Sequence, residues 1–545
     1  MNSKIIKSTI LILSIVLYFF LLCNLYQSIL GYVNNNFTYP LDDSYIHLAI
    51  AKNIAEHGVW GINSNEFSSA SSSPLFTVIL SLFLFIFGNN SYIPLILNIL
   101  FSLSTIYLAW YYFKDKLSYI LLSLLLISII IWTPLPGLTI IAMEHIIHAF
   151  LTLFYLLLIW EILINNNQSK KIIYLYYLIS FLLPISRYEG LFIIIGGNLI
   201  LFFSKKFRIS IIGVLCSILS ISLFGLYFIY NGGTFFPYSV IIKTSLSNSV
   251  VFYKLLPYKN ILLYYIKDIA SRQLLICFIF VLTFSFLVQL KLKKNILKII
   301  IILSIGIILH VMYSKFGWLN RYEAFLFPSI LCILFYSIQQ ACIKSKNLSF
   351  KHQLLYFSLF ILLIYPSCFF TKRSLINHEK IIIGAEEIHN QQYQTALFIQ
   401  KYYPNKSVAI NDIGYPSYLS NNTHIVDIYG LGNTQIALAK KNKSKNINPV
   451  IINEIKKNNV KAAFIYKKWF SDDLYKDWVE IGYWEINHRV RYIGKLAISG
   501  TTGGACVYIF STSTELNDIE YLKNSLKEFN KNQLTQNAHF TKLEK

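Results

Sequence analysis

Long apolar runs recur along most of the chain, and they constrain its fold more than any other feature of the sequence. Each run has roughly 18–22 residues, the length that a helix needs to cross a hydrocarbon core of about 30 Å. Charged residues make up only 14% of the chain, whereas soluble domains carry about 25%. Because only helices satisfy their own backbone in lipid, the runs predict an integral membrane protein with many transmembrane helices.

The sequence predicts about eleven transmembrane helices. A further apolar run at 74–87 is too short to cross the bilayer, and its length indicates an interfacial or re-entrant segment. The predicted spans are 5–30, 92–113, 117–133, 144–164, 172–186, 188–204, 209–230, 274–290, 297–313, 324–340 and 354–370.

Lysine and arginine residues gather in alternate loops between these spans. A chain that starts in the cytoplasm places all of those loops on the cytoplasmic side, as the positive-inside rule requires. The first run has no small-residue cleavage site, so we interpret it as a retained helix. The membrane topology thus explains the formal charge of +22. The sequence lacks a continuous basic stripe with interleaved aromatic residues, so it does not indicate nucleic-acid binding. The basic loops are 114–116, 170–171, 205–208, 291–294 and 344–351.

The composition changes abruptly near Lys372, and we predict two domains from it. Residues 1–371 form the transmembrane domain, with a first outer loop at 31–91. Residues 372–545 form a small α/β domain outside the membrane, and a polar tail begins near Ser511. The predicted strands are 407–410, 424–427, 462–466 and 506–510, and the predicted helices are 392–402 and 449–458.

Adjacent carboxylates at Asp42 and Asp43 are the strongest local signal for chemistry. They lie just outside the first helix, where their mutual repulsion raises one pKa and suits a general base. The structural alternative is that one of them caps a helix over 44–57. Capping explains one acid well and two acids less well.

Other polar groups fall on the same outer side. Glu144 and His148 share one face at the outer end of a helix, beside His145. They fit a polar site, a metal site or simple packing, and the spacing differs from the His-Glu-x-x-His pattern of zinc proteases. The serine run at 68–73 is typical of an ordinary loop.

Two Arg-Tyr-Glu triplets, 187–189 and 321–323, also lie on the outer side. Each arginine either pairs internally or snorkels to the headgroups, but a guanidinium at a membrane surface also suits a lipid phosphate. Lys243, in the loop that opens with 231–237, is a further candidate phosphate contact. Together with a carboxylate base, these cations suit transfer of a sugar from a lipid-phosphate donor.

In their order along the chain, these motifs resemble those of the GT-C membrane glycosyltransferases. The resemblance is strongest to the bacterial branch that includes the mycobacterial terminal arabinofuranosyltransferases. It extends more distantly to protein O-mannosyltransferases and lipid A aminoarabinose transferases. The matching pieces are Asp42-Asp43-Ser44-Tyr45, 71–75, Met143-Glu144-His145, Arg187-Tyr188-Glu189-Gly190, 231–243, Arg321-Tyr322 and 411–431.

The resemblance implies inverting transfer of a sugar from a polyprenyl-phosphate donor to an envelope glycan, lipid or protein acceptor. The site would lie on the periplasmic face of a bacterial inner membrane, with a cytoplasmic N-terminus and a periplasmic C-terminal domain. No cofactor is required, although a divalent cation on either aspartate is possible. The implied roles are catalytic base for Asp42 or Asp43, donor-phosphate binding for Lys243, Arg187 and Arg321, and substrate binding for Glu144, His145, Tyr45, Tyr188, Glu189 and Tyr322.

Two other functions fit a polytopic protein. A transporter or flippase of a lipid-linked glycan usually shows inverted repeats and charged or broken helices near the midplane, and the sequence shows no repeat. A non-catalytic envelope assembly protein would use the C-terminal domain as a binding module. That function leaves the paired aspartates and the outer arginines without a task.

Overall fold

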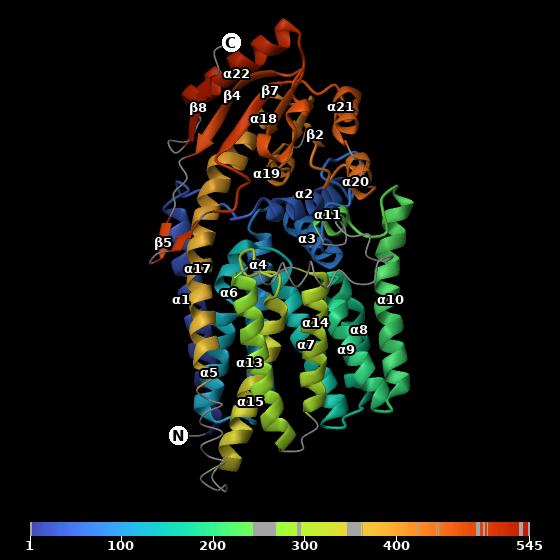
Figure 1. Cartoon of the computed structure of the whole chain (residues 1–545), viewed down its shortest axis with the longest axis vertical. Helices are drawn as coiled ribbons and strands as arrows, with labels where there is room; N and C mark the ends of the chain where they lie inside the picture. Colours follow the sequence, from blue (N-terminus) through green and yellow to red (C-terminus); the bar gives the residue numbers. More distant parts are fainter. Residues whose placement is uncertain are drawn as a thin grey trace.

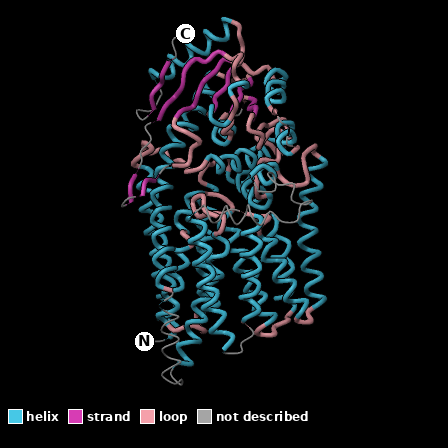
Figure 2. Tube along the Cα trace, viewed as in Figure 1, coloured by secondary structure: helices cyan, strands magenta, loops and turns pink. Residues whose placement is uncertain are grey.

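The computed structural model describes residues 3–243, 269–291, 296–314, 316–345, 361, 363–420, 422–442, 444, 446–486, 491–493, 496–498, 500–532 and 538–542. The molecule is elongated, with a bundle of long helices at one end and a mixed α/β domain at the other (Figure 1, Figure 2). We call the end of the bundle that faces the α/β domain the domain end. The N-terminus lies at the opposite end, which we call the far end (Figure 1).

Helices dominate the described part of the chain up to the α/β domain. They are α1 (Ser3–Leu30), α2 (Asp42–His57), α3 (Pro74–Phe87), α4 (Ile93–Phe113), α5 (Tyr119–Trp132), α6 (Leu135–Ile141), α7 (His145–Leu163), α8 (Lys170–Ser186), α9 (Gly190–Phe203), α10 (Phe207–Tyr230), α11 (Tyr238–Lys243), α13 (Ile269–Lys291), α14 (Leu297–Tyr313), η2 (Ala324–Leu326), α15 (Phe327–Ser345) and α17 (Ile364–Ile388).

Within the described residues, six helices are long and apolar enough to cross a membrane, and four shorter apolar helices accompany them. Large side chains such as Phe20 and Leu219 are exposed, Phe20 by 67%. Exposed apolar surface of this kind suits lipid and not water. The predicted polytopic helical membrane protein is confirmed. The count of about eleven spans stays a prediction, and residues 354–360 and 362 of the last predicted span, 354–370, lie outside the described residues.

Several predicted cytoplasmic loops meet at the far end. Lys7 near the N-terminus forms an ion pair with Asp115 in the loop after α4, with a distance of 2.6 Å between nitrogen and oxygen. Tyr112 at the end of α4 donates to Glu161 at the end of α7, at 2.7 Å. Lys206, in the loop after α9, donates to Asn166. The described loops around Asp115, Asn166 and Lys206 therefore share one end of the bundle with the N-terminal end of α1.

The first loop places α2 and α3 between the bundle and the α/β domain (Figure 1). Helix α3 coincides with the short apolar run at 74–87. Its start is capped by Ser73, whose hydroxyl accepts from the Phe76 N–H, and Pro74 occupies the first turn. Helix α2 starts after Leu41 with no side-chain cap, so neither Asp42 nor Asp43 caps it.

The α/β domain contains a six-stranded sheet in the order β2-β1-β3-β7-β4-β8, and a separate hairpin of β5 and β6. Strands β2, β1 and β3 are parallel, and the other three are antiparallel. Its elements are η3 (His389–Tyr393), α18 (Gln394–Tyr402), β1 (Ser407–Ile410), α19 (Gly414–Leu419), β2 (His424–Asp427), α20 (Thr434–Lys441), α21 (Asn448–Lys457), β3 (Ala462–Ile465), η4 (Lys467–Trp469), η5 (Asp472–Leu474), β4 (Val479–Ile486), β5 (Arg491–Ile493), β6 (Leu496–Ile498), β7 (Cys506–Ser511), α22 (Leu516–Asn532) and β8 (Ala538–Lys542).

Two features of this domain differ from the expected layout. Helix α17 runs without a break across the predicted domain boundary at 371–372 and leads into η3. The stretch expected to be a polar tail forms α22 and then β8, which adds to the edge of the sheet beside β4. Helix α22 is amphipathic, and it buries Leu522, Leu526 and Phe529 although most of its residues are polar.

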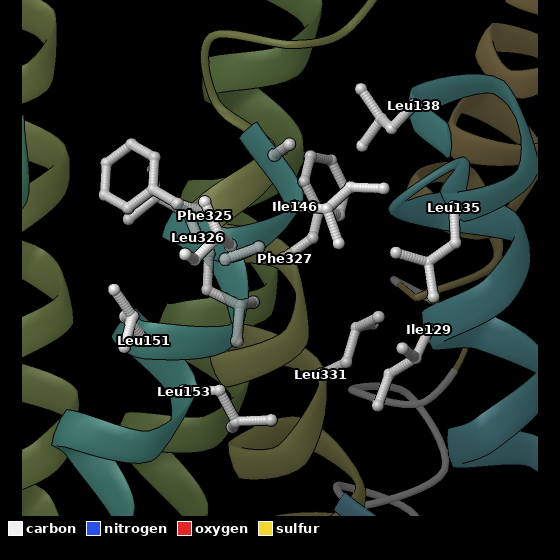
Figure 3. Packing of buried hydrophobic residues seen from close by; sticks show 14 of the residues in the cluster. Ile129, Leu135, Leu138, Ile146, Leu151, Leu153, Phe325, Leu326, Phe327 and Leu331 are labelled. Atoms are coloured by element: carbon white, nitrogen blue, oxygen red, sulfur yellow. The ribbon is translucent and has the colours of Figure 1, made fainter. Parts of the chain in front are cut away.

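An apolar core separates the polar groups at the domain end from the far end. Figure 3 shows Phe325, Leu326 and Phe327 packed near residues of α5, α6, α7 and α15. These side chains belong to one buried cluster that extends through the bundle. Close packing of this kind holds the ends of α7 and α15 at fixed positions below the polar residues described next.

Candidate active site

Asp42 and Asp43 begin α2, and their side chains have different partners. The Asp42 carboxylate is buried and accepts from the backbone N–H groups of Gly414, at 2.5 Å, and Tyr415, at 2.9 Å. Both of its oxygens are therefore held by α19 of the C-terminal domain. Only glycine fits at 414, because a Cβ there would lie 2.0 Å from the Asp42 carbonyl oxygen.

Burial raises the pKa of the Asp42 carboxyl well above its usual value, and the nearby Asp412 carboxylate raises it further. The two backbone donors act in the opposite direction, because they stabilise the charged form. The predicted mutual repulsion of Asp42 and Asp43 contributes as well, but it is a smaller influence than burial or Asp412.

Asp43 points to the bundle and pairs with Arg321, with 2.8 Å between Oδ2 and the guanidinium nitrogen. The Asp43 side chain is 21% exposed, whereas that of Arg321 is 3% exposed. Arg321 also donates to the Met143 sulfur at 2.7 Å. Asp43 is thus the accessible carboxylate of the pair, and a buried cation is fixed beside it.

Glu144 is the centre of a second group of polar side chains. It is fully buried, and its Oε1 accepts from Arg187 at 2.5 Å and from Ser72 at 2.9 Å. Its Oε2 lies 3.2 Å from the His47 ring nitrogen. Residues from α2, the loop before α3, the start of α7 and the turn after α8 are therefore joined through this one carboxylate.

Arg187 has most of its donors committed to carboxylates. Besides Glu144 it bonds both oxygens of Glu189, at 3.2 and 2.7 Å, and it lies 3.2 Å from the His145 ring nitrogen. These contacts use four of the five N–H donors of Arg187, so bidentate binding of a phosphate here would require it to release one of these partners. By contrast, the Nε of Arg321 has no hydrogen-bond partner among the described residues.

Tyr322 connects the two groups. Its ring centre lies 5.1 Å from the Arg321 guanidinium carbon, 5.8 Å from that of Arg187 and 6.2 Å from the His145 ring centre. Both arginines are within cation–π distance of this one ring. The predicted residues brought together in this way are Asp43, Glu144, His145, Arg187, Glu189, Arg321 and Tyr322.

Three predicted residues, Asp42, Tyr45 and Tyr188, lie apart from this cluster. Asp42 and Tyr45 face the C-terminal domain, where Tyr45 stacks on Tyr415 with ring centres 3.8 Å apart. Tyr188 packs edge-on against Phe236, with 5.3 Å between ring centres. Lys243 ends α11, and its side chain lies outside the described part of the structure.

Sequence reasoning missed two partners of Glu144. His47 was not singled out, although it lies one helical turn after Asp43 on α2. The serine run was expected to be an ordinary loop, yet Ser72 bonds Glu144 and Ser71 lies 3.1 Å from the His47 ring. His148, which was predicted to share one helix face with Glu144, has its ring 3.0 Å from the Ser186 hydroxyl oxygen.

No group of three or more histidine, cysteine, aspartate or glutamate side chains that could hold a metal ion occurs among the described residues. A divalent cation bound by fewer protein ligands, with substrate phosphates completing its shell, would follow the usual habit of Mg²⁺. Asp43 is the carboxylate whose exposure fits that role.

Comparison with known proteins identifies the fold. The chain matches the structure of ArnT from Cupriavidus metallidurans bound to undecaprenyl phosphate, with a TM-score of 0.51 and 10% identity over 93% of this chain and 98% of that one. It also matches the Archaeoglobus fulgidus oligosaccharyltransferase tethered to an acceptor peptide, with a TM-score of 0.52 and 12% identity over 88% of this chain and 72% of that one.

The chain therefore has the GT-C fold, as its motifs predicted. Residues 386–510 match a family model described as a domain of unknown function, DUF8728. This match covers most of the C-terminal domain and leaves the bundle unassigned. A search of curated proteins found no match.

Proposed function

We propose that the chain is an inverting glycosyltransferase that takes a sugar from a polyprenyl-phosphate donor. The acceptor is an envelope glycan, a lipid or a protein. The GT-C fold supports this proposal, since ArnT was solved with undecaprenyl phosphate and the oligosaccharyltransferase with an acceptor peptide. The observation that carries it is the Asp43–Arg321 pair, in which an accessible carboxylate lies beside a buried cation at the domain end.

Asp43 is the catalytic base in this proposal. A general base must reach the proton that it removes, and the 21% exposure of the Asp43 side chain meets that condition. Asp42 is unsuited, because both of its oxygens accept from backbone N–H groups of α19. Its role is to hold the C-terminal domain against α2.

The reaction is a single displacement. The Asp43 carboxylate takes the proton from the acceptor hydroxyl, and the hydroxyl oxygen forms a bond to the anomeric carbon of the donor sugar. The bond between that carbon and the phosphate oxygen breaks, and its electron pair leaves with the phosphate. Arg321 stabilises the charge that develops on the phosphate, because its guanidinium is buried and fixed before the reaction starts.

Arg187, Glu144 and His145 position the site in this proposal. Arg187 pairs with both Glu144 and Glu189, and His47 lies against Glu144, so this network links α2, α7 and the turn after α8. Lys243 remains a candidate for the donor phosphate on its sequence position at the end of α11.

The domain end is the periplasmic side of a bacterial inner membrane in this proposal, and the N-terminus is cytoplasmic. The clustering of the basic loops with the N-terminus at the far end supports that orientation, because positive charge is retained in the cytoplasm. Fusion of a periplasm-active reporter to the C-terminus tests it.

The experiment that tests the function compares strains in which the deleted gene is replaced by wild type, Asp43→Asn, Asp42→Asn or Asp473→Asn at equal protein level. Asp473 is an exposed carboxylate of the C-terminal domain and serves as the matched control. Mass spectrometry then quantifies envelope glycans and polyprenyl-phosphate sugars. The same assay in isolated membranes, with chelator and with added Mg²⁺ or Mn²⁺, tests the divalent cation.

We expect the deletion and Asp43→Asn to lose the same sugar from the envelope while its lipid donor persists. The rate with Asp43→Asn should fall about 10²–10⁴-fold, the usual contribution of a general base. Asp473→Asn should behave as wild type. If Asp43→Asn keeps a glycan that the deletion loses, Asp43 is not the base, and the protein moves or organises its substrate instead.

A further inference from the structure

Helix α2 contacts different parts of the molecule with its two faces. Asp43 and His47 contact charged residues of the bundle. Asp42, Tyr45 and Lys52 contact α19, which lies next to α2 on the side of the C-terminal domain (Figure 1). A helix turns by about 100° per residue, so the second group falls within about 80° on one side of α2 and the first group on the other. Helix α2 therefore links the candidate active site to the C-terminal domain.

Helix α19 is held at both ends by charged side chains of α2. At its start, the Asp42 carboxylate accepts from the N–H groups of Gly414 and Tyr415. Near its end, the Lys52 ammonium donates to the Tyr418 carbonyl oxygen at 2.7 Å and lies 5.4 Å from the centre of the Tyr418 ring. An anion at the start of a helix and a cation at its end each satisfy backbone groups that have no partner within the helix. We call these two contacts the α19 clamp.

Lys52 is an unfavourable residue for this position on grounds of stability alone. Its side chain is buried, with 2% of the residue exposed. Burial lowers the pKa of the Lys52 ammonium, although Glu56, one turn further along α2, acts in the opposite direction. An apolar side chain of similar length would avoid the desolvation of a charge. The bond to α19 is therefore the task that accounts for a cation here.

The α19 clamp acts on the start of α2, where the proposed base lies. Asp42 directly precedes Asp43, so the contacts of Asp42 with α19 fix the backbone from which the Asp43 side chain extends. Thr501 of the C-terminal domain donates through its hydroxyl to the Pro40 carbonyl oxygen at 2.6 Å, which holds the chain just before α2 as well. Misplacement of a catalytic group by about 1 Å can lower a rate about 100-fold. The position of the C-terminal domain is therefore coupled to the geometry of the base.

We propose that Lys52 is a positioning residue, which holds Asp43 in its working position through the α19 clamp. The C-terminal domain is in this way a part of the active site and not only a separate binding module. The clamp itself stands on the contacts of Asp42 and Lys52. Only its effect on transfer rests on the proposed glycosyltransferase function, with Asp43 as the base.

The test compares Lys52→Met and Lys52→Gln, which remove the cation, with Lys52→Arg, which keeps it. Lys401→Met is the matched control, because the Lys401 side chain is 40% exposed in the C-terminal domain and pairs with Glu528. Hydrogen exchange of the full-length proteins in nanodiscs, read by mass spectrometry, reports how firmly residues 42–52 and 414–419 are held. Transfer per folded molecule is measured in isolated membranes, with lipid extract of the deletion strain added as the donor at several concentrations.

We expect both uncharged variants to exchange the amide hydrogens of these two segments about tenfold faster than wild type. Their maximal transfer rate should fall about 10- to 100-fold, while the donor concentration for half-maximal rate changes less than about twofold, because the base and not the donor is misplaced. Lys52→Arg should recover part of both losses, and Lys401→Met should match wild type. Adding Lys52→Met to Asp43→Asn should lower the rate no further, because Lys52 acts through Asp43.

Unchanged hydrogen exchange in both uncharged variants overturns the α19 clamp, whatever the transfer rate. Faster exchange with an unchanged maximal rate overturns the positioning role, and so does a double variant in which the two single losses multiply. Failure of the proposed function is a separate result. In that case Asp43→Asn keeps the sugar on the envelope, and the exchange data still decide whether Lys52 holds α19 against α2.

Discussion

The molecule carries the same three residues, Arg-Tyr-Glu, at two turns of the domain end, and their surroundings differ. In the first turn Arg187 bonds the glutamate of its own triplet and also Glu144. In the second turn Arg321 bonds Asp43 on α2, and Glu323 pairs with Arg373 of α17 and accepts the Gly317 N–H at 2.8 Å.

In the first turn the arginine and the glutamate of the triplet pair with each other, whereas in the second turn they pair with residues of two other helices. Arg187 is shared by two carboxylates and holds the elements around it together. Arg321 is paired with a single, partly exposed carboxylate, and its triplet glutamate stabilises a different helix. Local sequence therefore specifies the polar turn, while the partner that faces it distinguishes a structural role from the catalytic role that we propose for Arg321.

The largest expected effect comes from Arg321. Replacing it with methionine removes the cation beside Asp43, and we expect the transfer rate in membranes to fall about 10²–10³-fold. The amount of folded protein should change little, because Asp43 is partly exposed and gains water in place of the lost partner. Turnover of the lipid donor, normalised to folded protein, measures this effect.

Arg321→Lys is the control that keeps the charge. It should recover part of the rate, since an ammonium lacks the planar fork of donors but keeps electrostatic stabilisation. A rate for Arg321→Met within threefold of wild type would place the second turn in the same structural class as the first.

Arg187→Met should instead lower stability. It leaves Glu144 and Glu189 without their cation, Glu144 being fully buried, and the loss should reach about 3 kcal/mol of unfolding free energy. The expected readout is a lower thermal unfolding temperature of the purified protein. The triple variant Arg187→Met, Glu144→Gln, Glu189→Gln removes the uncompensated charges and should recover part of that stability. Without any recovery, the network of charges is not the cause.

Replacing the glutamates of the two triplets, Glu189 and Glu323, should change the free energy of unfolding by a smaller amount. Glu323→Gln leaves Arg373 with an uncharged partner while the amide oxygen still accepts the Gly317 N–H, so we expect a loss of about 1–2 kcal/mol. Glu189→Gln should cost less, because Arg187 keeps Glu144. The transfer rate per folded molecule should stay at the wild-type value in both variants, as measured in membranes containing equal folded protein.

Much of this fold was predictable because the constraints are local. Membrane helices must be apolar over a fixed length, which located the helices of the bundle. The parallel strands β1, β2 and β3 are short and mostly buried, and each was predicted within one residue of its bounds. Helix α22 and β8 were not predicted, because polar residues dominate both segments. Their few apolar residues become buried only when the segments pack on the rest of the domain.

The membership of the candidate site was easier to predict than its pairings. Costly charges at helix ends on one side of the membrane marked Asp43, Glu144, Arg187 and Arg321. The pairs themselves depend on tertiary packing, as Arg321 and Asp43 are 278 residues apart in the sequence. For the same reason the sequence left both aspartates as candidates for the base, since the contact that engages Asp42 comes from Gly414 in another domain.

The tyrosines give the smallest and most sensitive comparison of the two turns. The Tyr188 hydroxyl is buried and has no hydrogen-bond partner among the described residues, so Tyr188→Phe should leave stability unchanged or raise it by up to about 1 kcal/mol.

Tyr322 lies within cation–π distance of both arginines, and its hydroxyl accepts from Arg321 at 3.4 Å. Tyr322→Phe keeps the ring and removes the hydroxyl with that weak bond, so the transfer rate should fall less than in a variant that lacks the ring. Tyr322→Leu removes the ring that connects the arginines, and a rate much lower than that of Tyr322→Phe would show that the first turn influences the second through this ring. Equal rates for the two variants would mean that the turns act independently.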